Sequence, residues 1–265
     1  MKQITHKLNF LVQTFKISFI ADLEFRSNLL LQLVNDILWF FTQIVIFEVL
    51  FRYQPKIGDW TIDSMRIFMA MFFLSTTIES VLFSDNLSQL SEWVRTGHLD
   101  FMLIKPIPSQ MVVSLYRMNP LFSINFFLVL GWFIYLLSQF TGELSALRLF
   151  LFPILILGSV LILYSLRMLC STLSVIFVKA DFIVYLWFQF MRVGMRPDDM
   201  YPSILRYIIK SIVPVAFLVS VPVKWLLFED SWWWFAGCIF VPLIFFYLTT
   251  RFWNFALRKY TSASS

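Results

Sequence analysis

Long apolar stretches separated by short polar segments are the feature of this sequence that most restricts its fold. The longest covers residues 147–178, and others cover 29–51, 111–137 and 232–253. A helix needs about 20 apolar residues to cross the hydrocarbon core of a bilayer. Of the 265 residues 59% are apolar and 14% are charged, whereas a soluble domain has about 45–50% and about 25%. One globular core cannot hide this much apolar surface, so we expect an all-α polytopic membrane protein.

Five segments are predicted to cross the membrane, and the chain begins with a different kind of helix. The predicted crossings are residues 29–51, 67–83, 111–137, 147–178 and 232–253. The fourth is longer than a crossing requires, so we expect it to be tilted or kinked, with Pro153 as a cause. Residues 1–25 predict an amphipathic helix in the headgroup plane, with an apolar stripe of Ile4, Leu8, Leu11, Phe15 and Phe19.

Residues 179–228 allow two topologies with six crossings. Lys179 and Asp181 form a polar break, residues 182–193 are apolar, and residues 206–228 are apolar but broken by Pro214 and Pro222. In one scheme the chain crosses outward from residue 182, and 203–228 is a re-entrant hairpin. In the other, 182–205 lies on the cytoplasmic surface and 206–228 crosses. The positive-inside rule slightly favours the second scheme. Either scheme puts both termini on one side, and basic residues at both ends favour the cytoplasm.

The motif content argues against an enzyme and against a nucleic-acid-binding protein. No GxxxxGK[ST] sequence or Gly-rich phosphate cradle occurs, and the two histidines, His6 and His98, are far apart. The net charge of +5 is assigned to cytoplasmic loops, because no basic run with interleaved aromatic residues occurs. Cys170 and Cys238 lie in apolar stretches and are interpreted as small buried hydrophobic residues. We therefore expect no cofactor or metal on this chain.

Polar residues follow one side of the first predicted crossing. Gln32, Asn35, Asp36, Trp39 and Gln43 fall within an arc of about 100° on a helix. A polar stripe in a membrane must face protein or water. It therefore indicates either a translocation pathway or subunit interface, or hydrogen bonding within the helix bundle.

Further polar residues lie at depth in the second and third crossings: Glu79, Arg117, Asn119 and Asn125. Glu79 and Arg117 would both lie near the inner leaflet if the two helices are antiparallel neighbours, so an ion pair is one hypothesis. In the alternative, Arg117 extends to the lipid headgroups.

Residues 84–108 predict a short amphipathic helix between the second and third crossings. Ser84 or Asp85 can cap its start, and Leu87, Leu90 and Val94 form an apolar stripe. Gly97 can end it in a left-handed conformation. Asp100 would then cap the next helix or pair with Arg95 or Lys105. The segment is either a plain surface connector or a rigid cytoplasmic projection that a partner grips.

The same segment resembles a signature of type-2 ABC transporter permeases. The sequence Glu92-Trp-Val-Arg-Thr-Gly-His-Leu-Asp100, followed by Leu103-Ile-Lys-Pro106, is similar to the family's basic-x-Gly-x-Leu-Asp-x-x-Leu-x-Lys-Pro element. Residues 175–181 (VIFVKAD) resemble the segment before the fifth crossing, with Lys179 where many relatives have Arg. Tyr201, Pro202, Pro214 and Pro222 resemble the Pro-marked hairpin after it. The most similar branch is the small, six-span, single-domain permeases of bacteria.

The resemblance implies the remaining assignments. The chain would form a permease dimer with an identical or homologous copy in the bacterial inner membrane. Its apolar faces would contact membrane lipid, and both termini would lie in the cytoplasm. Separate ATPase subunits would hold ATP and Mg²⁺. Residues 1–25 would be the connecting helix and 26–265 the permease domain. The fifth crossing would start after Asp181, with 203–228 as the re-entrant hairpin.

The family also implies a coupling helix at residues 84–97, which would transmit ATPase movement to the spans of an exporter. The residues assigned to coupling are Leu87, Leu90, Trp93, Val94, Arg95, Gly97, Leu99, Asp100, Lys105 and Pro106. Cargo would move at the permease dimer interface. The alternatives are a polytopic scaffold or assembly factor without a transport cycle, and a membrane-embedded enzyme or channel.

Overall fold

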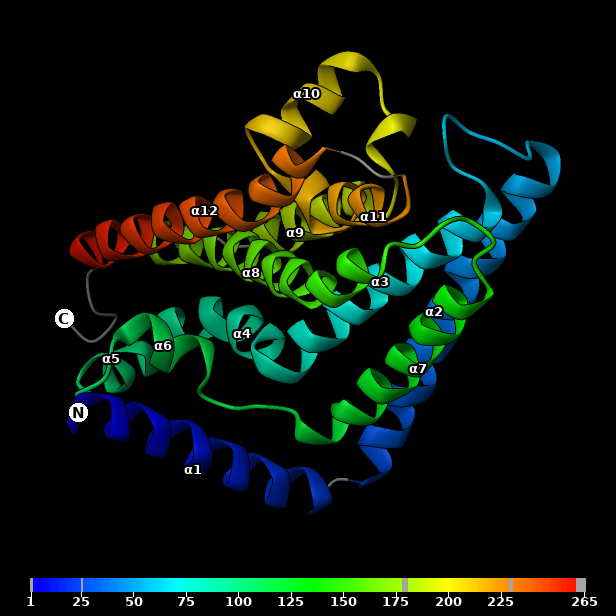
Figure 1. Cartoon of the computed structure of the whole chain (residues 1–265). Coiled ribbons are helices and arrows are strands. Elements are labelled where there is room, and N and C mark those ends of the chain that lie inside the picture. The colour runs from blue at the N-terminus through cyan, green and yellow to red at the C-terminus, as the bar shows by residue number, and fades with distance from the viewer. Residues whose placement is uncertain (1, 25, 178–180, 229–230, 261–265) are drawn as a thin grey trace.

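The computed structural model describes residues 2–24, 26–177, 181–228 and 231–260, and these are largely helical (Figure 1). The longer helices are α1 (Lys2–Glu24), α2 (Arg26–Tyr53), α3 (Ile62–Leu82), α7 (Ser123–Gln139), α8 (Ala146–Ile176), α9 (Asp181–Gly194) and α12 (Trp232–Lys259). The shorter ones are α4 (Ser84–Arg95), α5 (His98–Leu103), α6 (Ser109–Ser114), α10 (Ser203–Ser211) and α11 (Ser220–Leu227). Three 3-10 turns join them, η1 (Pro120–Phe122), η2 (Asp198–Met200) and η3 (Val215–Leu218).

Four helices among the described residues are long and apolar enough to cross a membrane. They are α2 from Leu31, α3, α8 and α12. These four lie where the first, second, fourth and last crossings were predicted, and Pro153 lies inside α8 as expected. The amphipathic segment at the start of the chain is also helical, as α1.

The prediction of one continuous third crossing over 111–137 is wrong. The chain forms α6, leaves the helix at Leu115, and becomes helical again in η1 and α7. Pro120 contributes to this break because proline has no backbone N–H to donate to a helix. The continuous helix α7 begins only at Ser123 and has 17 residues, the last two of them beyond the predicted segment.

Side chains from other helices satisfy the backbone of this break. The Asn86 amide donates to the carbonyl oxygens of Ser114 (2.8 Å) and Arg117 (2.6 Å). The Asn86 amide oxygen accepts from the Arg117 N–H at 3.0 Å. The Met118 N–H donates to Ser18 Oγ of α1 at 3.0 Å. Because unpaired backbone groups are costly away from water, these bonds make the interruption possible.

The long helices alternate in direction between two ends of the molecule (Figure 1). α1 begins and α12 ends at one end, beside α5 and α6, and we name this the terminal end. α10 and α11 lie at the other end, the distal end, with the loop 54–61. The ion pair between Glu48 near the end of α2 and Arg66 near the start of α3 (2.6 Å) shows that these two helices are antiparallel neighbours. Trp60 of the loop donates to Asp199 at 3.0 Å and so joins the loop to the segment before α10.

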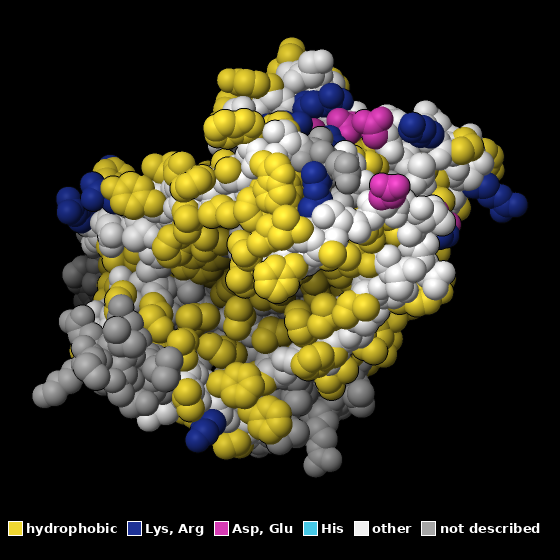
Figure 2. Space-filling view, viewed as in Figure 1, with side chains coloured by type: hydrophobic (Ala, Val, Ile, Leu, Met, Phe, Trp, Pro, Cys, Tyr) yellow, Lys and Arg dark blue, Asp and Glu magenta, His cyan; other side chains and the backbone are white. Residues whose placement is uncertain are grey.

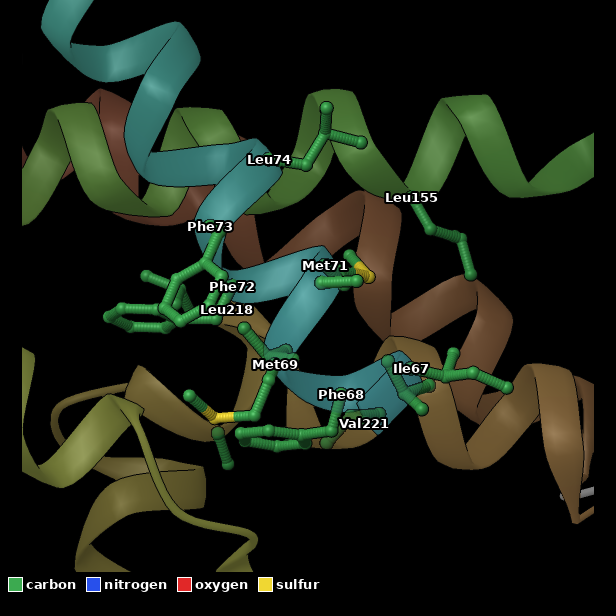
Figure 3. Packing of buried hydrophobic residues seen from close by; sticks show 14 of the residues in the cluster. Ile67, Phe68, Met69, Met71, Phe72, Phe73, Leu74, Leu155, Leu218 and Val221 are labelled. Atoms are coloured by element: carbon green, nitrogen blue, oxygen red, sulfur yellow. The ribbon is translucent and has the colours of Figure 1, made fainter. Parts of the chain in front are cut away.

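Helix α3 lies at the centre of the apolar core. Residues 67–74 are each at most 1% exposed, on every side of the helix. A helix that is apolar all round must be buried on all sides. Leu155, Leu218 and Val221, from α8, η3 and α11, pack around it (Figure 3). In the most apolar window of α3 67% of residues are buried, against 6% in α2, so α2 lies at the margin of the molecule.

Helices α8 and α12 approach each other at a glycine. A Cβ atom added to Gly158 would lie 2.5 Å from the Cys238 carbonyl oxygen and 3.5 Å from Pro242 Cγ. Small residues at such positions let membrane helices pack closely by van der Waals contact. Thr249 of α12 also donates to the Ser165 carbonyl of α8 at 3.4 Å.

We expect Gly158→Ala to destabilise the protein by about 1–3 kcal/mol, because the added methyl group meets a backbone atom that cannot rotate away. Gly131→Ala in α7 is the matched control, since a Cβ at Gly131 meets nothing within 4 Å. Thermal unfolding of the purified variants in detergent is the measurement. Equal melting temperatures for the two variants would show that the α8–α12 contact does not depend on glycine.

Candidate functional site

A cleft of about 990 Å³ runs between α2, α3 and α9. Most of its lining is apolar and aromatic, including Trp39, Phe72, Trp187 and Met191. Polar groups lie at its two ends: Gln43, Thr76, Glu79, Ser84, Arg167, Arg192 and Arg196. A large apolar pocket with a few placed polar groups is the usual form of a small-molecule site.

A buried ion pair closes the cleft toward the terminal end. Glu79 is 4% exposed, and its Oε1 lies 3.7 Å from Arg167 Nη1. The Arg167 guanidinium also stacks over the Trp187 ring, with Cζ 4.4 Å from the centroid. It donates to the Ser84 carbonyl at 3.3 Å and thereby reaches the first residue of α4.

Beyond this cluster lies a second cavity of about 370 Å³. Its wall carries hydroxyl groups from α4 and α8, those of Ser84, Ser88, Ser91, Ser171 and Ser174. Arg167 and Trp187 line both cavities. The ion pair and the indole ring therefore separate an aromatic cleft from a hydroxyl-lined cavity beside α4.

Helices α4 and α5 form a compact projection at the terminal end, which we name the α4–α5 knob (residues 84–103). Gly97 joins them with φ +73°, in the left-handed conformation that the sequence predicted. Leu87 and Leu90 are 2% and 0% exposed and pack on α6 and α8. Ser171 of α8 donates to the Leu87 carbonyl at 2.7 Å.

The knob turns a polar face outward. Ser88, Gln89, Glu92, Arg95 and Thr96 are exposed on α4. Arg95 forms a two-bond ion pair with Glu92, at 2.9 and 2.7 Å. Two apolar side chains stand out beside this face, Phe101 at 66% and Ile104 at 80% exposed. This is a surface that another protein can contact.

Residues 37–264 match the family described as ABC-2 family transporter protein. The chain belongs to the ABC-2 transporter family. Its resemblance to type-2 ABC permeases is thereby confirmed, and it is a multi-pass membrane subunit, distinct from the ATPase with which such subunits generally associate. No curated protein and no solved structure matches the chain.

The residues that the sequence assigned to coupling in this ABC-2 permease divide into three groups by exposure. Trp93, Leu99 and the stripe of Leu87 and Leu90 are buried in the knob, whereas Arg95 and Pro106 are exposed. Val94, Gly97, Asp100 and Lys105 are half-buried. The buried group holds the knob to the permease, so only the second and third groups can touch a partner.

Two local details of the knob differ from expectation. The predicted cap at Ser84 or Asp85 is wrong, because α4 starts at Ser84 with Phe83 as its N-cap and no side-chain cap bond. Asp85 instead accepts a hydrogen bond from Asn119 at 2.8 Å. Asp100 does not pair with Arg95, which binds Glu92, or with Lys105, which lies over the Tyr116 ring at 4.7 Å.

Asp100 contacts the end of the last helix. Burial and the neighbouring Asp100 carboxylate raise the pKa of Tyr260, the residue that follows α12. Asp100 also lies in the first turn of α5, where a negative charge is favourable. The knob therefore contacts α12 as well as α8.

The polar residues predicted to line a pathway or interface are dispersed. Gln43 and Glu79 line the cleft, as does Trp39. Gln32 and Asn35 are exposed on α2. Asp36 accepts from the buried Asn125 at 3.1 Å and so joins α2 to α7, and Asn119 binds Asp85. Asp36, Asn125 and Asn119 therefore form hydrogen bonds within the helix bundle.

The cation beside Glu79 is Arg167 rather than Arg117, so the hypothesis of a Glu79–Arg117 pair is wrong. Arg117 lies in the break before α7, where its backbone binds Asn86.

Of the two residues predicted to form a polar break before the fifth crossing, Lys179 lies outside the described residues and Asp181 is the first residue of α9. Cys170 and Cys238 are both buried, in α8 and α12.

A second charged cluster, at the distal end, was not recognised from the sequence. Asp198 is fully buried, and Lys210 Nζ and Lys224 Nζ lie 2.6 and 2.7 Å from its carboxylate oxygens. Ser220 donates a further hydrogen bond to it, and Lys224 also reaches Asp199 at 2.5 Å. The cluster joins η2, α10 and α11. In Figure 2 charged side chains gather near α10, while hydrophobic ones cover the middle of this face.

This cluster controls the ionisation of Asp198. Burial alone would raise the pKa of Asp198, but the hydrogen bonds from Lys210, Lys224 and Ser220 outweigh it and lower that pKa from 3.8 to about 2. A depressed carboxyl pKa contributes stability above the unfolded value and loses it as the pH falls toward the folded value. The contribution is about 2 kcal/mol and should be lost between about pH 4 and pH 2.

We expect Asp198→Asn to loosen residues 197–224 at pH 7, because it leaves two lysines without their buried partner at a cost of about 3–5 kcal/mol. Hydrogen exchange of this segment between pH 7 and pH 2 is the measurement. The wild-type segment should lose protection only below about pH 4, and the variant should lack it throughout. Glu143→Gln, at an exposed distal-end carboxylate, is the control. Wild-type protection in Asp198→Asn would contradict the clamping role of this cluster.

Proposed function

We propose that the chain is the permease subunit of an ABC exporter of the bacterial inner membrane. It crosses the membrane six times, works as a dimer with a second permease, and is driven by ATPase subunits that bind ATP and Mg²⁺. The observation that supports this most directly is the α4–α5 knob, which projects at the terminal end and carries the family's Gly-x-Leu-Asp element at its turn.

The alternation of the helices supports the six crossings. In this proposal α2, α3, α7, α8, α9 and α12 cross in turn, so the terminal end is cytoplasmic and the distal end is outside. Helices α10 and α11 have 9 and 8 residues, about 14 and 12 Å of helix, and are the shortest of the helices that follow α8. Residues 203–228 are therefore assigned to a hairpin that enters from outside and returns.

The exposure of α2 supports a permease dimer. Gln32 and Asn35 are exposed on a helix that is otherwise apolar. Polar side chains in a membrane span face protein or water, because facing lipid is costly. A second permease against α2 would supply those partners and would place the cleft between α2 and α9 at the interface.

The contacts of α4 indicate how force would reach the cleft. α4 continues directly from α3 and is held to α8 by the Ser171–Leu87 and Arg167–Ser84 hydrogen bonds. An ATPase that moves the exposed polar face of the knob would move α4 against α8. The Glu79–Arg167 pair at the end of the cleft would then separate or close, and the cleft would open to one side at a time.

We expect Ile204→Cys to react with an impermeant thiol reagent added outside intact cells, and Ile104→Cys to react only after permeabilisation. The two positions are matched controls for each other, since they are 79% and 80% exposed at opposite ends of the molecule. The chain is expressed without its ATPase so that Ile104 stays uncovered. The reverse labelling pattern would overturn the orientation, and labelling of both from inside would favour the second topology.

We expect Gly97→Val to uncouple the permease from its ATPase while the protein still inserts and dimerises. A β-branched residue at φ +73° is strained by about 1–2 kcal/mol, which disturbs the knob but not the fold. Asp100→Ala should act similarly, by removing the contact with Tyr260. Copurification of the ATPase, ATP turnover of the complex and melting temperature are measured together.

Gly131→Val in α7 is the control for Gly97→Val, because the same side chain enters open space there. The isolated chain should hydrolyse no ATP in any form. A Gly97→Val protein that keeps both its ATPase and its turnover refutes the coupling role. Failure of any ATPase to copurify with the wild-type chain favours the scaffold or assembly factor.

A further inference from the structure

The distal part of the cleft carries two positive charges that no described carboxylate neutralises. Arg192 and Arg196 both line the cleft and both are exposed. Glu79 and Arg167, the other two charges of the cleft wall, form an ion pair, whereas neither the Arg192 nor the Arg196 guanidinium group lies within 4.0 Å of a described carboxylate. Arg192 lies in the last turn of α9 and Arg196 two residues beyond its end, and both face the same cleft. An anion bound at this end of the cleft would be attracted by both charges.

The acidic groups nearby are already engaged. Asp198 binds Lys210 and Lys224, and Asp199 binds Lys224 and Arg206. At the other end of the cleft, Glu79 lies against Arg167 and those two charges cancel. Glu79 is the one carboxylate among the described residues of the cleft wall, so the cleft has an excess of two positive charges.

Between its charged ends the cleft is suited to an apolar body. Trp39, Phe72, Trp187 and Met191 form its wall, and its volume of about 990 Å³ lies at the upper end of the range for drug-sized ligands. Arginine binds carboxylate, phosphate and sulfate groups through two parallel hydrogen bonds. Two arginines on the wall of one cleft offer such a group two sets of donors.

We infer that the cleft binds an anionic amphiphile of drug size or with a single alkyl chain. Its anionic group lies on Arg192 and Arg196, and its apolar part lies along Trp39, Phe72 and Trp187. The inference rests on the proposed function, because it names the chemical class of the exported cargo. A cationic amphiphile of the same shape would place its charge against the arginines and therefore binds the site more weakly.

Binding can be measured without the ATPase. The full chain is placed in nanodiscs of phosphatidylcholine, and a dodecyl phosphate brominated along its chain is added to quench the tryptophans of the cleft. We expect saturable quenching by this probe. The trimethylammonium probe with the same brominated chain should bind at least about tenfold more weakly, a difference of about 1.4 kcal/mol.

The double variant R192Q/R196Q should bind the phosphate probe at least about tenfold more weakly than the wild-type chain does. It should bind the phosphate and trimethylammonium probes with equal affinity. R192K/R196K, which keeps both charges, should retain the preference for the anion. Arg52→Gln is the matched control, because Arg52 is an exposed arginine at the end of α2 that does not line the cleft. Equal affinity of the wild-type chain for the two probes overturns the inference, and this comparison requires no variant. So does wild-type affinity in R192Q/R196Q.

Two further arms separate the remaining explanations. Exchanging phosphatidylcholine for phosphatidylglycerol lowers the local concentration of an anionic probe for every variant. The ratio of wild-type to R192Q/R196Q affinity for the phosphate probe should therefore stay unchanged. A tenfold loss of that ratio would assign the arginines to a bilayer headgroup and overturn the inference. Stimulation of the ATPase complex by the same probe tests the proposed function separately. If the probe binds but no functional ATPase complex forms, the proposed transporter function is rejected and the anion site stands. If the complex is coupled but the probe does not change its ATPase rate, the anion site alone is rejected.

Discussion

The pairing of backbone groups at the break before α7 is the constraint on which the arrangement of this permease depends. Water is not available inside a bilayer, so an interrupted helix survives only if protein groups bind the freed N–H and C=O groups. Asn86 binds three of them with one amide, and Ser18 binds a fourth. Asn86 belongs to α4 and Ser18 to α1. The interruption, the knob and the first helix therefore form one unit at the terminal end.

This unit explains why a short helix can transmit force. Asn86 ties one side of α4 to the break before α7, while Leu87 and Ser84 tie its other side to Ser171 and Arg167 of α8. Each bond is made to backbone, so α4 cannot turn about its axis without breaking several at once. The apolar stripe of α4 is buried against the same neighbouring helices. Its movement is therefore that of a rigid body attached to two membrane segments, and the exposed polar face remains for a partner.

The sequence predicted the elements whose signal is local and missed those that depend on distant residues. The runs at α2, α3, α8 and α12 are long enough to be recognised alone, and Gly97 is the residue type that a left-handed turn favours. The break before α7 was missed, since Asn86 lies 31 residues from Arg117. Arg167 was missed because a single cation in the apolar run of α8 reveals its partner only when α3 lies beside it. Pro120 was the one local sign of the break.

Charge in the described parts of this chain follows a rule that separates structure from recognition. The two buried carboxylates among the described residues, Glu79 and Asp198, are balanced, the first by Arg167 and the second by Lys210 and Lys224. Such balance is needed because a lone charge away from water is costly. Arg192 and Arg196 are different, since they are exposed on the wall of one cleft and no described carboxylate pairs with them. In the proposed orientation they also lie outside, where the positive-inside rule predicts few cations. Folding does not require them there, and so their position is better explained by an anion that the cleft receives.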